Sequence, residues 1–264
     1  MSENTDTRNP VRHHRTLILS DLHLGAFGAR ADLLLRFLRD NRAEIYLFAG
    51  DVLDLGHRML SSWTEDHEAV LEHLRLRKAA GATIIYVRGN HDPAPEAVPA
   101  GRRLPVEAVG RAVHVAADGR RYLVIHGDEV DARLLRSHVV TRLGTVADRL
   151  LRGVDSMIEQ YVYSGNPRRR SVIETLLSLA NRGLAPRRAH ERRLAVLARE
   201  AGFDGVICGH FHLPALRDLG GVRYANCGDW LDSFTALAED FDGGMRLIGG
   251  RAVLAAPSRP EAVS

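Results

Sequence analysis

The sequence contains little cysteine and almost no lysine. Its two cysteines, Cys208 and Cys227, are too few for the disulfide framework of a small secreted protein, and they favour a reducing compartment. Lys78 is the single lysine among 36 Lys and Arg residues, a ratio typical of codon bias in a GC-rich genome, so individual arginines carry little information. The formal net charge of +3 is too small to indicate a nucleic-acid-binding protein by itself.

Long apolar segments are also missing. No apolar run approaches the roughly 20 residues that a membrane-spanning helix needs, and the polar first residues lack the apolar stretch of a signal peptide. Apolar residues make up 45% and charged residues 26% of the chain, the proportions of an ordinary soluble globular protein. We therefore expect a cytoplasmic protein, which could also lie peripherally on the cytoplasmic face of a membrane.

A single domain is predicted over residues 15–254, between loose tails at residues 1–14 and 255–264. Its first part alternates strand and helix patterns, which predicts a parallel sheet covered by helices. The predicted strands are Thr16–Ser20, Ile45–Ala49 and Thr83–Val87, and the predicted helices are Arg30–Arg39 and a segment from a Ser62/Glu65 capping box to Gly81.

The pattern changes after Pro105, where short strands follow one another. A hairpin is predicted around the Asp118-Gly119 turn. The predicted strands are Arg111–Ala116, Arg121–His126, Gly205–Cys208, Val222–Asn226, Ser233–Leu237 and Met245–Ile248. We expect an α/β fold with two sheets, of which the second is the more antiparallel.

Residues 131–200 differ from both parts. Apolar residues recur at helical spacing from Leu135 to Tyr161, and helical patterns follow at Ser171–Asn181 and Arg187–Glu200. This segment is predicted to be a helical insertion in the α/β domain.

Polar side chains gather directly after the predicted strands, in the blocks SDLH, AGDVLD, GNHD, IHGD and GHFH. The carboxyl edge of an α/β sheet is where ligand sites form. Two residues that are two positions apart at a strand end point to the same side, so each such pair can enter one site. The candidate residues are Asp21, His23, Asp51, Asp54, Asn90, His91, His126, His210 and His212.

Carboxylate, imidazole and amide groups are ligands suited to Mn²⁺, Fe or Zn²⁺ and not typical of a thiolate site. Seven ligands are enough for two metal ions that share a bridging carboxylate, an arrangement suited to phosphoryl chemistry. Each block alone has a structural explanation, as a helix cap, a turn residue or a satisfied polar group. The ordered set of five blocks has no such simple explanation.

The blocks D-x-H, GD-x-x-D, GNHD, HGD and GHFH, in this order, resemble the calcineurin-like metallophosphoesterases from about Thr16 to Ile248. The resemblance implies a four-layer αββα sandwich of two mixed sheets with a dinuclear site. It implies one metal ion held by Asp21, His23, Asp51 and His212. It implies a second held by Asp51, Asn90, His126 and His210, with Asp51 as the bridge.

By the same resemblance, His91 corresponds to the general acid and Asp54 to its orienting partner. Independently, a histidine beside Asn90 but outside the ligand set can protonate a departing oxygen. Substrate contacts are expected from Asn90, His91 and His210. Two divalent metal ions are implied, with manganese expected and Fe, Zn or Mg as alternatives.

Within the family, three features resemble the UDP-2,3-diacylglucosamine pyrophosphatases of lipid A biosynthesis: IHGDEVDA, the insertion before GHFH, and NCGDW followed by SFTAL. This implies hydrolysis of a lipid-linked sugar nucleotide to UMP and a lipid sugar 1-phosphate. The insertion would form a lid over acyl chains and contact the inner membrane; a solvated cap or a dimer surface is the alternative. The branch has Arg in place of His91.

Other functions are compatible with parts of the pattern. A generic phosphodiesterase or phosphatase acting on another small phosphoester fits the five blocks. A nuclease would use the arginine clusters at 168–170 and 187–188, but no aromatic residues are interleaved with them, which argues against nucleic acid as a substrate. A non-catalytic scaffold would lack metal ligands, and none is missing.

Overall fold

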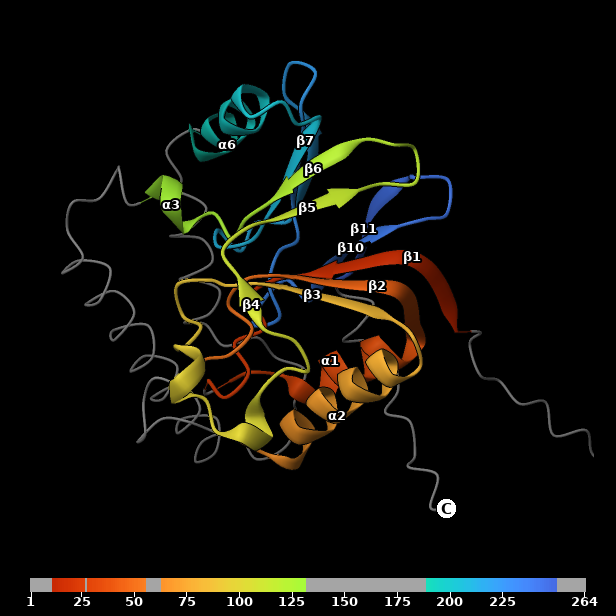
Figure 1. Ribbon diagram of the computed structural model, residues 1–264, viewed down its shortest axis with the longest axis vertical. Helices are drawn as coiled ribbons and strands as arrows, with labels where there is room; N and C mark the ends of the chain where they lie inside the picture. Colours follow the sequence, from red (N-terminus) through yellow and green to blue (C-terminus); the bar gives the residue numbers. More distant parts are fainter. Residues whose placement is uncertain (1–10, 27, 56–62, 132–188, 251–264) are drawn as a thin grey trace, which may run out of the picture.

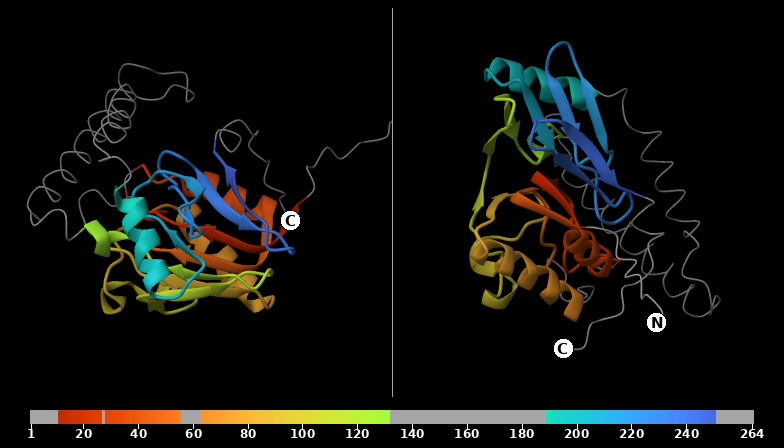
Figure 2. Two further views of the ribbon diagram at one scale, coloured as in Figure 1. Left: turned by 90° about the horizontal axis from the view of Figure 1, so that it is seen from above. Right: turned by 90° about the vertical axis from the view of Figure 1, so that its right-hand side faces the viewer.

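The computed structural model describes residues 11–26, 28–55, 63–131 and 189–250, and it contains two facing β-sheets between layers of helix (Figure 1). The six-stranded sheet has the order β11-β10-β1-β2-β3-β4, and the five-stranded sheet has the order β5-β6-β7-β9-β8. Helices α1 and α2 cover the outer face of the first sheet, and α6 covers that of the second (Figures 1 and 2). This is the predicted four-layer αββα sandwich of two mixed sheets.

The six-stranded sheet combines the N-terminal strands with the last two of the domain. Its strands are β1 (Arg12–Leu19), β2 (Asn41–Ala49), β3 (Thr83–Val87), β4 (Ala108–Val109), β10 (Thr235–Glu239) and β11 (Met245–Gly249). β1 to β4 run parallel, as the alternation of strands and helices predicts. β10 and β11 do not join the later sheet, because β10 pairs antiparallel with β1. Each sheet thus contains two antiparallel pairs.

The five-stranded sheet contains β5 (Ala112–Val115), β6 (Arg121–Val124), β7 (Gly205–Cys208), β8 (Ala215–Asp218) and β9 (Arg223–Asn226). The β5/β6 hairpin confirms the prediction, and Gly119 in its turn has a φ of 84°, which glycine adopts without steric cost. β4 and β8 were not predicted, because neither carries a run of large apolar residues.

The described helices are α1 (Ala31–Asp40), α2 (Glu65–Ala79), α3 (Asp128–Asp131) and α6 (Ala189–Glu200), with short 3₁₀ turns at Pro95–Ala97 and Ala100–Arg102. The predicted start of α2 is wrong. The helix is capped by Thr64, whose backbone N–H donates to Nδ1 of His67 over 3.2 Å, so the capping pair is Thr64/His67 and not Ser62/Glu65. Ser62 lies outside the described residues.

The ordered sheet begins inside the predicted N-terminal tail. Arg12, His13 and His14 pair with the first residues of β2, and Nε2 of the buried His14 lies 3.2 Å from Oδ1 of Asn41. The predicted tail boundary at residue 14 is therefore wrong. Residues 132–188 of the predicted insertion and the tail at 255–264 lie outside the described residues, whereas α6 confirms the helix predicted at the end of the insertion.

Three clusters of buried apolar side chains fill the spaces between the four layers. Leu17 of β1 packs toward α1 and its Leu38, whereas the next residue, Ile18, packs between the two sheets, as strand alternation requires. Leu194 of α6 packs on the outer face of the second sheet. Each fully buried side chain of this size stabilises the fold by about 1.5–3 kcal/mol. The packing therefore holds the carboxyl ends of both sets of strands in fixed positions.

Candidate metal centre

The five polar blocks meet at one edge of the sandwich. Asp21 follows the end of β1, Asp51 that of β2, Asn90 that of β3, His126 that of β6 and His210 that of β7. Three overlapping groups have potential ligand atoms within 4.8 Å of one another. They are Asp21/His23/His212, His23/Asp54/His91 and Asp21/Asp51/His126.

The backbone at this edge is unusual. Asp21, His23, Asp51, His210 and His212 all have positive φ, between 46° and 67°. Phe234 is the one other non-glycine residue in the described ranges with positive φ. Such conformations cost about 1 kcal/mol or more each and persist where the surrounding structure holds them, which is common at functional sites.

These angles also correct the explanation for why both members of the Asp21/His23 pair point into the site, which was expected to be strand alternation. Asp21 and His23 lie beyond the end of β1, so strand alternation does not direct them. Two left-handed residues on either side of Leu22 turn both polar side chains into the site, while Leu22 is buried in the helix-side core. The two side chains point to the same side, as expected, but the left-handed backbone and not strand alternation is the cause.

One half of the site lies around Asp21. Its Oδ1 is 3.2 Å from Nε2 of His212 and 4.0 Å from Nε2 of His23. Its Oδ2 accepts hydrogen bonds from Oγ of Ser20 (2.5 Å) and from the backbone N–H of His210 (2.9 Å). The second oxygen is thus held by the protein, which leaves Oδ1 for the two imidazoles or a cation.

The other half lies around Asp51 and His126. Oδ2 of Asp51 is 3.2 Å from Nε2 of His126, which is in turn 3.2 Å from Oδ1 of Asn90. Nδ1 of His126 lies 3.0 Å from the carbonyl oxygen of Ala49, an acceptor that fixes the tautomer and presents Nε2 to the site. The centroids of the His210 and His126 rings are 5.1 Å apart.

Asp51 connects the two halves. Its Oδ2 lies 3.2 Å from Nε2 of His126 and 3.9 Å from Nε2 of His23. Its other oxygen accepts the backbone N–H of His91 over 2.7 Å. One carboxylate oxygen thus faces imidazoles from both groups, which is the geometry that a bridging ligand requires.

Asp54 lies between two imidazoles. Its Oδ2 is 3.2 Å from Nδ1 of His91 and 3.4 Å from Nδ1 of His23. The sequence predicts only the contact with His91. The second contact places Oδ2 of Asp54 beside Nδ1 of His23, while Nε2 of His23 faces the carboxylates of Asp21 and Asp51.

The pKa values reflect close packing of opposite charges. Burial raises the pKa of Asp21, but His212 outweighs it and holds the pKa well below its usual range. Burial lowers the pKa of His126 and of His212, but the carboxylates of Asp51 and Asp21, respectively, raise these pKa values to about 10 and about 9. Because a divalent cation needs unprotonated imidazoles, it would take the place of these protons.

Nε2 of the buried His23 lacks a hydrogen-bond partner among the described residues, and it lies 4.0 Å from Oδ1 of Asp21 and 3.9 Å from Oδ2 of Asp51. A buried polar atom without a partner is costly, and one cation between this nitrogen and the two carboxylates would satisfy it. The donor set is carboxylate and imidazole, which suits Mn²⁺, Fe or Zn²⁺. The residues present therefore fit a divalent metal.

The site is closed on one side and open on the other. Asp21, His23, Asp51 and His126 are buried, whereas the side chains of His91 and His212 are 25% and 36% exposed. Asn90 is also exposed. A substrate can therefore reach the face that carries His91 without displacing the buried residues.

Three residues outside the predicted ligand set support the site. Ser20 bonds both Asp21 and the carbonyl oxygen of Ala49. The buried Asp229 of the NCGDW block lies 3.9 Å from Nδ1 of His212. Asp92 accepts three backbone N–H groups from the loops that follow β2 and β3. The blocks contain all three residues, but their roles depend on contacts that the sequence does not display.

Two other residues of the NCGDW block belong to the cores. Cys227 packs between the sheets, and Trp230 packs in the helix-side cluster, with its ring 4.8 Å from that of Phe37. Among the described helices, none has the length and apolar character needed to cross a membrane.

A family model and several solved structures are similar to this chain. The family model described as calcineurin-like phosphoesterase matches residues 14–214. Solved structures similar to this chain include a single mutant of Vps29 from Entamoeba histolytica, with 14% identity over 88% of this chain and 96% of that chain and a TM-score of 0.41. They also include YfcE, a phosphoesterase from E. coli, with 16% identity over 88% and 97% of the two chains and a TM-score of 0.40. No curated protein matches the chain.

The family model covers well over half of the sequence, from His14 in the first half of β1 to just past the GHFH block. All five polar blocks lie inside the matched range. The chain belongs to the calcineurin-like phosphoesterase family, which makes it a metal-dependent phosphoester hydrolase.

Proposed function

We propose that the chain hydrolyses a pyrophosphate or phosphodiester bond at a centre of two divalent metal ions, with manganese as the expected metal. The proposed ligands are Asp21, His23, Asp51, Asn90, His126, His210 and His212. The observation that carries the proposal is the position of Asp51, whose Oδ2 lies between Nε2 of His126 (3.2 Å) and Nε2 of His23 (3.9 Å). When bound, two such ions polarise phosphoryl oxygens and supply hydroxide near neutral pH.

His91 is proposed to protonate the leaving group. Its side chain is 25% exposed at the open face, and its Nδ1 lies 3.2 Å from Oδ2 of Asp54. Because Asp54 accepts the Nδ1 hydrogen, Nε2 is the atom that delivers a proton to the departing oxygen. Asn90, His91 and His210 are proposed to contact the substrate, since all three lie at the open side of the site.

His91 can be tested with substrates that differ in leaving group. We expect His91→Ala to lower turnover about 10²–10⁴-fold on a substrate with a poor leaving group, the usual contribution of a general acid. The loss should be much smaller on a nitrophenyl ester, which needs no proton, and metal content should stay at the wild-type value. Equal losses on both substrates would contradict the acid role.

The proposed substrate is a UDP-2,3-diacylglucosamine-type sugar nucleotide, which is cleaved to UMP and the lipid sugar 1-phosphate. Support comes from the resemblance of IHGDEVDA, the insertion and NCGDW to that branch. Residues 131–200 are proposed to cover the acyl chains and to contact the cytoplasmic membrane face peripherally. A generic phosphodiesterase is the second candidate, and it is favoured by His91, where that branch has Arg.

UMP release distinguishes the two candidates. The manganese-loaded protein is incubated with UDP-2,3-diacylglucosamine and, separately, with a bis(nitrophenyl) phosphate. UMP release that is lost in Asp51→Asn and kept in the exposed-turn control Asp242→Asn supports the sugar-nucleotide reaction. Turnover of the simple diester without any UMP release supports the generic phosphodiesterase.

A further inference from the structure

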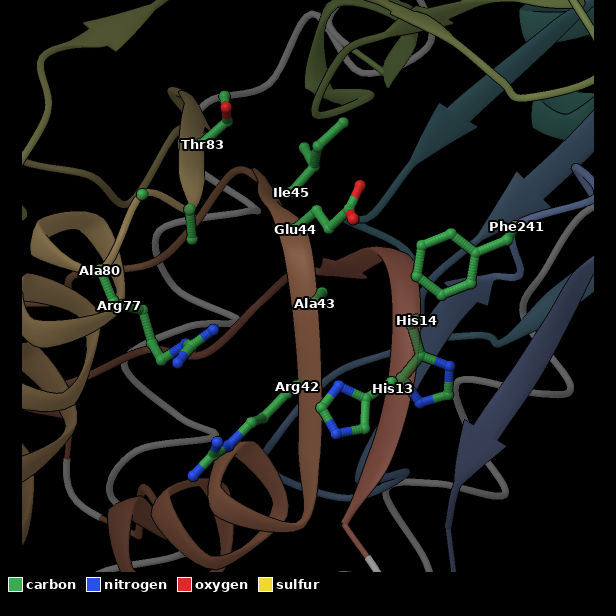
Figure 3. Close-up of a pocket in the computed structure, with 12 residues that line it drawn as sticks. His13, His14, Arg42, Ala43, Glu44, Ile45, Arg77, Ala80, Thr83 and Phe241 are labelled. Atoms are coloured by element: carbon green, nitrogen blue, oxygen red, sulfur yellow. The ribbon is translucent and has the colours of Figure 1, made fainter.

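A second pocket lies at the opposite edge of the six-stranded sheet, where β1, β2 and β3 begin (Figure 3). Its volume is about 530 Å³, within the range of small-molecule sites. In the described part of the chain, its lining shares no residue with the candidate metal centre. The side chains that determine its chemistry are His13, His14, Arg42, Glu44, Arg77 and Phe241.

The pocket has a basic end. Arg42 of β2 and Arg77 of α2 lie on the same side of β2, whereas the carboxylate of Glu44 lies toward Phe241 (Figure 3). Neither arginine forms an ion pair with a carboxylate of the described residues.

One buried donor of the lining lacks a hydrogen-bond partner among the described residues. It is Nε of Arg77, which carries positive charge. Buried donors without acceptors are rare because they lose their bonds to water. An anionic ligand in the pocket would supply an acceptor to this nitrogen.

The pKa of His73, which lies on α2 one turn before Arg77, is affected by the same basic groups. Burial lowers the pKa of His73, and Arg77, Arg39 and Arg42 lower it further, to about 4. Three guanidinium groups thus act on one imidazole. The charged groups that shift it are all basic, and the carboxylate of the pocket lining, Glu44, is not among them.

We propose that this pocket binds a small phosphorylated ligand, with its phosphate groups between Arg42 and Arg77. Guanidinium groups form paired, charge-assisted hydrogen bonds to phosphate oxygens. The Phe241 side chain is 57% exposed at the other end, where it offers an aromatic face to a base or another ring. The proposal does not depend on the reaction at the metal centre.

The test uses full-length, metal-free protein in EDTA, so that phosphates cannot bind through metal ions. Calorimetric titration with ATP and with tripolyphosphate measures the dissociation constants. We expect R42Q/R77Q to bind both probes about tenfold or more weakly than wild type, and R192Q/R193Q, a matched double change on the exposed side of α6, to differ by less than about twofold. R42Q alone, at an exposed position, should already weaken binding several-fold, which guards against misfolding of the double variant.

The outcomes separate the possibilities. Tighter binding of ATP than of tripolyphosphate, with that excess lost in F241A, identifies a nucleotide, whereas equal binding identifies a phosphate-bearing ligand without a ring. No binding by wild-type protein at about 10 mM probe, or equal weakening in R42Q/R77Q and R192Q/R193Q, would overturn the proposal. Phosphoesterase turnover of R42Q/R77Q with manganese should equal that of wild type, so the two proposals fail independently.

Discussion

Asp92 is expected to be the main structural support beneath the metal centre. It is 3% exposed, and its carboxylate accepts the backbone N–H groups of Asp51 (2.8 Å), Leu53 (2.8 Å) and Gly89 (2.7 Å). Burial raises the pKa of Asp92, an effect that hydrogen bonds from Leu53, Tyr86 and Gly89 counteract in part. One side chain therefore ties the loop after β2 to the loop after β3.

Asp92→Ala leaves three buried N–H groups without acceptors. Each such group costs about 1–3 kcal/mol, and because neighbouring losses are not additive we expect a total of about 3–6 kcal/mol. This is a large fraction of the roughly 5–15 kcal/mol that stabilises a typical domain. With a slope of about 2–3 kcal/mol per molar urea, the unfolding midpoint should fall by about 1–3 M.

Urea unfolding followed by circular dichroism measures this loss. Asp92→Asn keeps one acceptor oxygen and should lose about half as much stability, whereas Asp242→Ala, at an exposed turn, should change it by less than about 1 kcal/mol. If Asp92→Ala unfolds within about 1 kcal/mol of wild type with an unchanged slope, then the three bonds do not support these loops.

Two further predictions concern the centre and the sheet beneath it. A Cβ on Gly209 would lie 1.7 Å from Oγ of Ser20 and 2.3 Å from Oδ2 of Asp21, so Gly209→Ala should abolish metal binding; elemental analysis showing wild-type metal content would refute this. Burial raises the pKa of Glu239, but hydrogen bonds from His114, Thr16 and the Ala117 N–H outweigh it and lower the pKa to about 2. The charged form therefore stabilises the fold fully above about pH 4.5, and this contribution is lost as the pH falls toward about 2. In wild-type protein the urea unfolding midpoint should fall as the pH is lowered from about 4.5 to about 2, and Glu239→Gln should make this fall smaller. An equally large fall in Glu239→Gln would contradict the role given to Glu239.

The sequence indicates which polar residues gather at the candidate metal centre because each block combines two local signals. An apolar run marks a strand, and a polar pair next to a glycine marks its end, as in Asp21 and His23 after Leu19. Since parallel strands end at one sheet edge, the blocks after β1, β2 and β3 can be placed together from the sequence. The blocks after β6 and β7 belong to the other sheet, so their approach depends on how the two sheets face each other. The contact of Asp54 with His91 is implied by the resemblance to the family, and the structure contains it.

The rest depends on contacts between distant parts of the chain. The antiparallel pairing of β10 with β1 brings Glu239 beside Thr16, 223 residues away in sequence. His14 and His114 are buried in polar contacts with Asn41 and Glu239, although neither histidine belongs to a recognisable motif. The left-handed backbone at the ligand positions is likewise imposed by the assembled loops, since few non-glycine residues adopt it, although Asp and His do so more often than most.

The most direct test of the dinuclear centre is the metal content of the manganese-reconstituted protein, measured by elemental analysis together with turnover. Wild-type protein should hold two ions per chain, and Asp51→Asn should lose at least one of them together with nearly all turnover, because Oδ2 of Asp51 faces imidazoles from both halves of the site. Two ions and full turnover in Asp51→Asn, or fewer than two ions in active wild-type protein, would contradict the account.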